Sequence, residues 1–306
     1  MFVVSLTFLQ YDVFTNEPFS GNQLAVFLDG RGLSAETMQA IAKEMNFSES
    51  TFILPAEEAG TDVRMRIFTP GTELPMAGHP TIGSTFALAH TGVIRPGLPK
   101  FIFGLGVGPT PVDLEWRDGR LSFASMTQLN PTFGHSITDR DGAAASIGLD
   151  TNDLVADLPV QEVSCGVPYL LIPLRERTAV DRAETDIVAY RKLIARNRLA
   201  ADTCLYLFTV SPSDAEATTY SRMFAPGFGI AEDPATGSAA GPLGCYLVRH
   251  ALISGDAALR IVNLQGVKMG RASRMHVSIT EQAGQIVEVK VGGEAVLVAR
   301  GEVFVP

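Results

Sequence analysis

Cysteine is scarce in this chain of 306 residues, which contains only Cys165, Cys204 and Cys245. The three lie far apart and are odd in number, so they have neither the ligand spacing of a zinc site nor that of a disulfide framework. We interpret them as reduced residues of a cytosolic protein. The apolar N-terminal stretch has no basic region and no cleavage site of small residues, which predicts a first strand and not a signal peptide.

Long apolar runs and basic clusters are also missing. No stretch approaches the roughly 18 continuous apolar residues of a transmembrane helix. Asp and Glu outnumber Lys and Arg by 33 to 24, and the net charge is −9. We therefore expect a cytoplasmic protein that binds neither nucleic acid nor a membrane. A small anionic substrate remains compatible with this charge, because backbone N–H groups can bind an anion inside an acidic protein.

The common motifs of cofactor and nucleophile chemistry are absent as well. The sequence has no GxxxxGK[ST], HExxH or GxSxG and no closely spaced Cys/His set. Glycines alternate at Gly104, Gly106 and Gly108, but prolines follow them and no amphipathic helix begins there, as a dinucleotide fingerprint requires. We therefore expect no metal and no cofactor.

The chain does contain a repeat. Arg66–Gly71 (RIFTPG) returns as Arg222–Gly227 (RMFAPG), and each copy leads through a loop and a small-residue turn into an apolar segment. The turns are residues 77–80 and 236–239. The loop from Gly227 to Gly237 is longer than the loop from Gly71 to Gly78. We interpret the extra residues as the reason that the second loop contains Glu232, Asp233 and Pro234. A repeated strand–loop–helix unit predicts two similar domains.

Strands predominate in both halves and alternate with one or two helices, which predicts an α+β fold of two pseudo-symmetric domains. Each domain is expected to be a curved, mostly antiparallel sheet around a central helix. The predicted domains are residues 1–124 and 125–306, and a strand near 295–306 is a candidate to return to the first domain. The irregular segment 125–160 is interpreted as a linker into the second domain.

Two helices are expected to begin at the repeated turns. Pro80 suits the first position of a helix, which makes His79 the predicted N-cap. Pro242 cannot donate a hydrogen bond, so the second helix is expected to begin near Ala239. The amides around Gly78 and Gly237 would then lie at positive helix ends, which favour anions.

Glu49 is the unusual residue of the predicted strand 47–54. Its neighbours on both faces of that strand are largely apolar, so burial is expected to disfavour the charged carboxylate. Solvent exposure at the start of the strand is the alternative interpretation. Asn22 ends a turn-rich loop and offers a side-chain amide to a ligand, with an ordinary hairpin connection as its alternative.

The turns and their surroundings supply a small set of acid–base and hydroxyl groups, namely Glu49, His79, Asp233 and Ser238. A desolvated Glu suits a base that removes a proton from carbon next to an activating group. Two facing helix N-termini would hold a carboxylate or an enolate-like oxyanion. The set predicts proton transfer on a small carboxylic acid. In the alternative, His79 and Ser238 only cap helices and Asp233 only supports a turn.

With these residues in view, the chain resembles the PhzF-like isomerase family of phenazine biosynthesis, which shares the diaminopimelate-epimerase fold. The resemblance runs nearly end to end. It is carried by FSGNQLAVF (19–27), EMNFSESTF (44–52), RIFTPGTELPMAGHPTIG (66–83), SRMFAPGFGIAEDPATGSAAGPLG (221–244) and LQGVKMGR (264–271).

The resemblance implies that Glu49 is the catalytic acid/base and that His79 and Asp233 are further catalytic residues. It also implies that Ser238 is an active-site residue, and we expect the substrate to bind at Asn22, Gly78, Thr236, Gly237 and Ser238. The family reaction is the isomerisation of trans-2,3-dihydro-3-hydroxyanthranilate, in which a proton leaves one ring carbon and returns to another on the same face. The family is cofactor-free and usually dimeric, so we expect a homodimer acting on a small carboxylic acid.

Racemases of the same fold carry a cysteine in each turn, whereas the corresponding residues here are Ala77 and Thr236. Neither side chain exchanges a proton at neutral pH, which favours a single base over two-base racemisation. Two alternatives remain open. One is epimerase or lyase chemistry on an amino-acid-like substrate, and the other is a catalytically silent binding protein.

Overall fold

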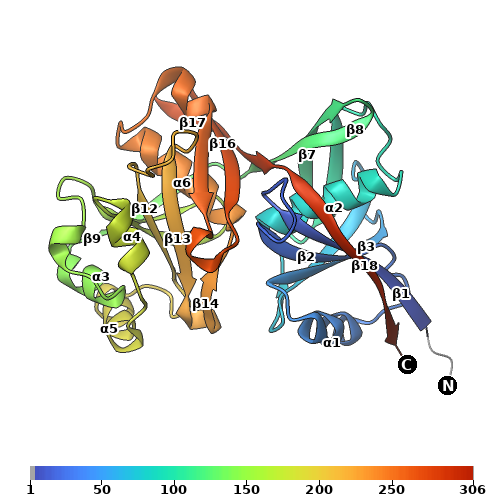
Figure 1. Cartoon of the computed structure of the whole chain (residues 1–306), viewed down its shortest axis with the longest axis horizontal. Helices are drawn as coiled ribbons and strands as arrows, with labels where there is room; N and C mark the ends of the chain where they lie inside the picture. Colours follow the sequence, from blue (N-terminus) through green and yellow to red (C-terminus); the bar gives the residue numbers. More distant parts are fainter. Residues whose placement is uncertain (1–3, 306) are drawn as a thin grey trace. The chain divides into compact units, whose positions relative to one another are not determined.

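The computed structural model describes residues 4–305, and the chain divides into two compact units. The first unit comprises Met1–Thr127 with Gly292–Pro306, and the second comprises Gln128–Val291. In Figure 1 each unit has one helix lying among strands, α2 (Gly78–His90) in the first and α6 (Gly237–Arg249) in the second.

The first unit contains α2, the amphipathic helix α1 (Ala35–Met45) and a set of mostly antiparallel strands. Its strands are β1 (Val4–Val13), β2 (Asn22–Phe27), β3 (Glu49–Pro55), β4 (Val63–Phe68), β5 (Glu73–Leu74), β6 (Lys100–Leu105), β7 (Gly108–Arg117), β8 (Arg120–Gln128) and β18 (Ala295–Val305). The C-terminal strand β18 pairs with β1 along its length.

The second unit is built in the same way around α6. Its other helices are α3 (Arg140–Ser146), α4 (Arg177–Arg182) and α5 (Ile187–Asn197). Its strands are β9 (Thr132–Ile137), β10 (Val160–Ser164), β11 (Pro168–Pro173), β12 (Cys204–Thr209), β13 (Thr219–Ala225), β14 (Ile230–Asp233), β15 (Ile261–Gln265), β16 (Ser273–Gln282) and β17 (Gln285–Gly293).

Strand pairing follows one pattern in both units. In the first, β2 runs parallel to β3, β3 antiparallel to β4, β4 parallel to β6, and β6 antiparallel to β7. In the second, β11 runs parallel to β12, β12 antiparallel to β13, β13 parallel to β15, and β15 antiparallel to β16. The predicted α+β fold with internal pseudo-symmetry is therefore confirmed.

Small residues let the central helices pack closely against strands. A Cβ added at Gly83 of α2 would lie 2.6 Å from Leu24 Cδ2, and one at Gly244 of α6 would lie 2.7 Å from Val277 Cγ1. Real Cβ atoms do not approach neighbours so closely, so any larger residue would push these side chains aside, and glycine allows the close packing seen here. Nearly every residue of α2 and α6 is buried, which fixes the N-terminal turn of each helix firmly in its unit.

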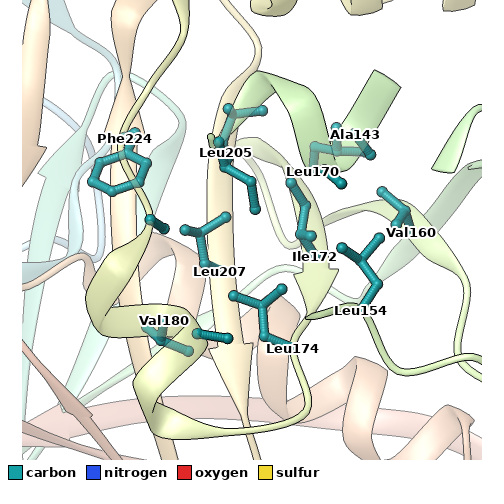
Figure 2. Packing of buried hydrophobic residues seen from close by; sticks show 14 of the residues in the cluster. Ala143, Leu154, Val160, Leu170, Ile172, Leu174, Val180, Leu205, Leu207 and Phe224 are labelled. Atoms are coloured by element: carbon teal, nitrogen blue, oxygen red, sulfur yellow. The ribbon is translucent and has the colours of Figure 1, made fainter. Parts of the chain in front are cut away.

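Apolar clusters fill the space beside the sheets. In the first unit α1 packs on β2, β3 and β4, where the Phe27 and Phe52 rings stack with centroids 4.7 Å apart. In the second, Figure 2 shows Leu170 and Ile172 of β11 and Leu205 and Leu207 of β12 packed together, with Ala143 of α3 nearby. This packing holds the strand ends that carry the candidate site residues.

The predictions for the two helix starts are wrong. The N-cap of α2 is Ala77 and not His79, which lies inside the first turn. Helix α6 begins at Gly237 with Pro242 in its interior, because the Thr236 carbonyl already accepts the Ala239 and Ala240 amides and closes the first turn.

The segment 125–160 is also not a simple linker. It completes β8 and forms β9 and a short 3₁₀ turn (Thr151–Asp153). The Ala-rich stretch 140–147, which the sequence predicts to be helical, forms α3. By contrast, the alternating glycines 104–108 lie at the β6–β7 hairpin, as expected for a run that opens no helix. Between residues 4 and 305, no helix is long and apolar enough to cross a bilayer.

Candidate active site

Three predicted site residues of the first unit come together at the start of α2. Asn22 begins β2, Glu49 begins β3, and the two strands run side by side in parallel. His79 Nε2 lies 3.2 Å from Glu49 Oε2, and Asn22 Nδ2 lies 3.3 Å from His79 Nδ1. The Glu49 side chain is 16% exposed and that of His79 is 5% exposed. The carboxyl group is therefore largely shielded from water.

Burial lowers the pKa of His79 to about 3, although a hydrogen bond with the Gln23 backbone acts in the opposite direction. The ring is therefore neutral at physiological pH, and its contact with Glu49 is not an ion pair. Asn22 Nδ2 approaches Nδ1, and a hydrogen bond with the Gln23 backbone also holds the ring. His79 Nε2 and Glu49 Oε2 are 3.2 Å apart but are not aligned for a hydrogen bond with each other, so the contact is a close approach of a neutral ring to a shielded carboxyl group.

The N-terminal turn of α2 carries no capping side chain among the described residues, since its N-cap is Ala77. The hydroxyl of Thr81 instead donates back to the Ala77 carbonyl at 2.8 Å. The first-turn amides, including that of Gly78, therefore retain the partial positive charge of a helix N-terminus. An anionic group is the natural partner of such a turn.

The second unit brings together the other predicted residues. Asp233 ends β14, Thr236 is the N-cap of α6, and Gly237 and Ser238 open the helix. Thr236 makes no side-chain cap, because its hydroxyl donates to Asp233 Oδ2 at 2.6 Å. Ser238 Oγ lies 2.6 Å from the Tyr169 hydroxyl.

Residues that sequence reasoning missed surround this second set. Gln265, at the end of β15, donates to the Asp233 carbonyl at 2.8 Å and to Thr236 Oγ1 at 3.0 Å. Tyr206 donates to Gln265 Oε1 at 2.9 Å. Gln265 lies in the motif LQGVKMGR, one of those that carry the family resemblance. That motif could have drawn attention to Gln265 as a site residue. Tyr169 and Tyr206 have no comparable signal in the sequence.

The two units can be aligned residue by residue from their ion pairs. Arg66 pairs with Glu73 and stacks on Phe68, and Arg222 likewise pairs with Glu232 and stacks on Phe224. Glu73 thus corresponds to Glu232.

The next residue in each copy follows from the strand register. Ile67 faces Leu74 in the first unit, and Met223 faces Asp233 in the second. Asp233 therefore occupies the position of Leu74. The interpretation that extra loop residues bring in 232–234 is wrong, because the extra residues precede Glu232.

The same alignment identifies the counterpart of Glu49. Thr51 pairs with Ile67 as Tyr206 pairs with Met223, so Glu49 corresponds to Cys204 at the start of β12. Burial raises the pKa of the Cys204 thiol to about 12. A carboxyl group and a neutral thiol thus stand at equivalent places, and only the first can exchange a proton readily near neutral pH.

Comparison with known proteins gives a consistent result. The family model described as phenazine biosynthesis-like protein matches residues 11–301. The chain is 37% identical to an uncharacterized isomerase of Mesorhizobium japonicum, over 97% of this chain and 98% of the relative. It is 36% identical to the trans-2,3-dihydro-3-hydroxyanthranilate isomerase of Pseudomonas aeruginosa, over 96% of this chain and 97% of that enzyme.

Solved structures agree on the fold. A phenazine biosynthesis protein of the PhzF family from Bacillus anthracis superposes with a TM-score of 0.89 at 27% identity, covering 99% of this chain and 100% of that one. A probable proline racemase from Agrobacterium radiobacter has a TM-score of 0.66 at 15% identity, covering 97% of this chain and 92% of the other. The second likeness concerns the fold alone and supports the predicted epimerase-type architecture.

Proposed function

The chain belongs to the family of phenazine biosynthesis-like proteins and is an isomerase, and from this premise we propose its reaction. We propose that it moves a proton along one face of a small cyclic or unsaturated carboxylic acid, with Glu49 as the single acid/base. The substrate we propose is trans-2,3-dihydro-3-hydroxyanthranilate or a close relative. The observation that carries the proposal is the shielded Glu49 carboxyl group beside the neutral His79 ring, 3.2 Å away.

In the proposed reaction the Glu49 carboxylate takes a proton from carbon, and the carboxylic acid so formed returns it to another carbon of the same conjugated system. The neutral His79 ring beside Glu49 is proposed to orient or polarise the substrate during both steps. The electrons left on carbon are delocalised into the substrate's carboxyl group. No external oxidant or reductant enters this sequence.

A helix start is the proposed binding place of the substrate carboxylate. The amides of Gly78 and Gly237 lie in first turns with no capping side chain, which favours negative charge there. Asn22, Thr236 and Ser238 complete the proposed binding set. Asp233 is proposed as a further catalytic group that orients or polarises the substrate.

Epimerase chemistry is less well supported than isomerisation. Inversion at carbon needs a base on each face, and the two positions that would carry thiols hold Ala77 and Thr236. The Thr236 hydroxyl is already committed to Asp233. A single base that works along one face is consistent with this arrangement.

Three further parts of the proposal follow from the family resemblance. We propose that the enzyme needs no added cofactor, acts as a homodimer and works in the cytoplasm. Light scattering coupled to size-exclusion chromatography measures the oligomeric state directly. A monomer at the concentration that supports full activity would contradict the dimer.

The test of the reaction is incubation of the purified protein with trans-2,3-dihydro-3-hydroxyanthranilate in heavy water, followed by proton NMR. We expect the substrate signals to decay and the isomerised product to form without any added cofactor. Failure of the wild-type protein to isomerise this compound would remove the substrate assignment. A screen of other unsaturated cyclic acids, read by deuterium entry at carbon, would then decide whether the proton-transfer proposal survives.

A further inference from the structure

The motif Leu264–Arg271 (LQGVKMGR) has no part in the proposed reaction, yet Gln265 within it is completely buried. Its Oε1 accepts from the Tyr206 hydroxyl at 2.9 Å and from the Thr236 amide at 3.3 Å. Its Nε2 donates to the Asp233 carbonyl at 2.8 Å and to Thr236 Oγ1 at 3.0 Å. A side-chain amide has two acceptor sites and two N–H groups, so its capacity is fully used on three residues.

These hydrogen bonds have a fixed direction. Because Gln265 Nε2 can only donate, Thr236 Oγ1 accepts there and its single proton is left for Asp233 Oδ2, 2.6 Å away. Farther back, the Tyr206 hydroxyl accepts from Asn263 Nδ2 at 2.8 Å and gives its own proton to Gln265. The chain of donors therefore ends on the Asp233 carboxylate.

The first unit provides an internal comparison for this network. Its ladder pairs Arg64 with Gly104, and the equivalent ladder pairs Tyr220 with Leu264, so Leu105 corresponds to Gln265. The first unit has apolar residues at all three equivalent positions, namely Leu74, Ala77 and Leu105 in place of Asp233, Thr236 and Gln265. The amide is thus present only where the carboxylate and the hydroxyl are present.

The shape of the turn does not explain the amide. A Cβ at Gly106 would lie 2.8 Å from Pro75 Cα, and a Cβ at Gly266 would lie 2.4 Å from the Pro234 oxygen. In both units a glycine after the strand lets the backbone pack directly on the proline of the turn. Both turns lead into a helix of 13 residues. The same framework therefore forms with Leu105 as well as with Gln265.

We propose that Gln265 is a positioning residue for the reaction, acting through the Thr236 hydroxyl to hold the Asp233 carboxylate in one orientation as a hydrogen-bond acceptor. The proposal rests on the proposed function only in treating Asp233 as a group that meets the substrate. Thr236 then orients Asp233, and its hydroxyl is not available to a ligand in the same arrangement. A hydrogen bond to the charged form of a carboxyl group stabilises that form.

The test compares four variants. Thr236→Val removes the hydroxyl at nearly constant shape, Thr236→Ser keeps it, and Gln265→Met removes the amide at similar length. The matched control is Thr219→Val, because Thr219 donates to Asn263 Oδ1 at 2.8 Å, is completely buried and lies at the far end of the same network. Thermal unfolding measures the stability of each variant and circular dichroism checks that it folds.

We expect Thr236→Val and Gln265→Met to lower kcat about 100-fold, with KM changed by less than about 3-fold, as for a misplaced acid–base group. Thr236→Ser should restore kcat to within about 5-fold of wild type, and Thr219→Val should stay within about 2-fold while its melting temperature falls. Equal losses of kcat in Thr236→Val and Thr219→Val would show that stability alone is responsible and would overturn the proposal. Full kcat in Thr236→Val would also overturn it.

A second measurement needs no substrate. In protein labelled with ¹³C at the Asp carboxyl carbons, the Asp233 signal is assigned from its loss in Asp233→Asn and followed against pH. We expect its titration midpoint to move upward by about one pH unit in Thr236→Val and not to move in Thr219→Val. An unchanged midpoint in Thr236→Val contradicts the positioning role. If the wild type does not isomerise dihydro-hydroxyanthranilate, this titration still decides the proposal on Gln265.

Discussion

The two units share a strand pattern, a central helix of 13 residues and an arginine–glutamate pair before the turn, yet they differ at almost every position that bears chemistry. Glu49 stands where the second unit has Cys204. His79 stands in the first helical turn where the second unit has Ser238. Asp233 stands where the first unit has Leu74. The framework is duplicated, and the reactive groups are not.

This difference supports the proposed transfer of a proton along one face of the substrate. A racemase needs equivalent bases on the two faces of its substrate, which a duplicated framework supplies directly. Here the Cys204 thiol stays neutral because burial raises its pKa to about 12, and it has no counterpart of the His79 ring beside it. This supports the proposal that proton transfer takes place in the first unit. In the second unit, the Asp233 carboxylate accepts a hydrogen bond from the Thr236 hydroxyl.

The largest expected effect comes from one of two separate substitutions, made at the equivalent residues that begin β3 and β12. Glu49→Gln keeps the shape but removes the proton-exchanging group, and we expect kcat to fall at least about 1,000-fold. Cys204→Ser should leave kcat within about 2-fold of wild type. Steady-state kinetics on the isomerised substrate measure both. Comparable losses in the two variants would contradict the assignment of proton transfer to the first unit.

The second comparison concerns the arginine–glutamate pairs. The Arg222 side chain is 8% exposed and donates to the backbone oxygens of Val180 and Ala183 as well as to Glu232. Arg222→Met leaves a buried carboxylate and these carbonyls without their partner, so we expect the free energy of unfolding to fall by about 3–5 kcal/mol.

The equivalent pair in the first unit is more open to solvent. The Arg66 side chain is 18% exposed, and that of its partner Glu73 is 40% exposed. Arg66→Met should therefore cost only about 0–1 kcal/mol. Urea unfolding of the two variants gives both values. A loss at Arg66 as large as that at Arg222 would show that the pairs are equivalent in stability as well as in position.

The last comparison concerns the pH dependence of stability. The folded pKa of His79, about 3, lies below its ordinary value of 6.5. Above pH 6.5 the ring is neutral in both the folded and the unfolded chain, so its titration does not change the free energy of unfolding there. As the pH falls from 6.5 toward 3, the unfolded chain binds a proton that the folded chain does not. His79 thus lowers the free energy of unfolding by about 1.4 kcal/mol per pH unit in that window.

His79→Gln should flatten the acid side of the stability curve by this amount, whereas Ser238→Ala at the equivalent position should leave the slope unchanged. Urea unfolding at several pH values between 3 and 7 measures the slopes. An equally steep acid side in His79→Gln would mean that the ring is protonated in the folded protein.

Sequence patterns predicted the parts of this molecule that depend on local spacing. The repeated Arg-x-Phe-x-Pro-Gly indicated the pseudo-symmetry, and the apolar surroundings of Glu49 on β3 indicated a shielded carboxyl group. Gln265 could not be assigned a role, because its bonds to Asp233 and Thr236 form only when β15 is placed beside β13 and the turn. A strand such as β9 was missed because most of its residues are exposed and show no apolar alternation.

The predictions of where α2 and α6 begin were wrong for another reason. The missing N–H of Pro242 favours a place in the first turn of the helix. In the structure, the Ala239 and Ala240 amides already close a turn on the Thr236 carbonyl, so α6 begins before the proline and contains it. The loop before Asp233 was misaligned because the anchoring contact, Arg222 with Glu232, joins residues of two strands. Charge pairing across strands decided the register, and it leaves no periodic signal in the sequence.

The most direct test of the central claim follows the migrating hydrogen itself. A substrate that carries deuterium at the carbon losing the proton is isomerised by the wild-type enzyme in ordinary water, and NMR locates the label in the product. With Glu49 as the single base, we predict that part of the deuterium appears at the new carbon and on the same face of the ring. Delivery of hydrogen to the opposite face, with no label transferred, would contradict the account and indicate a second base.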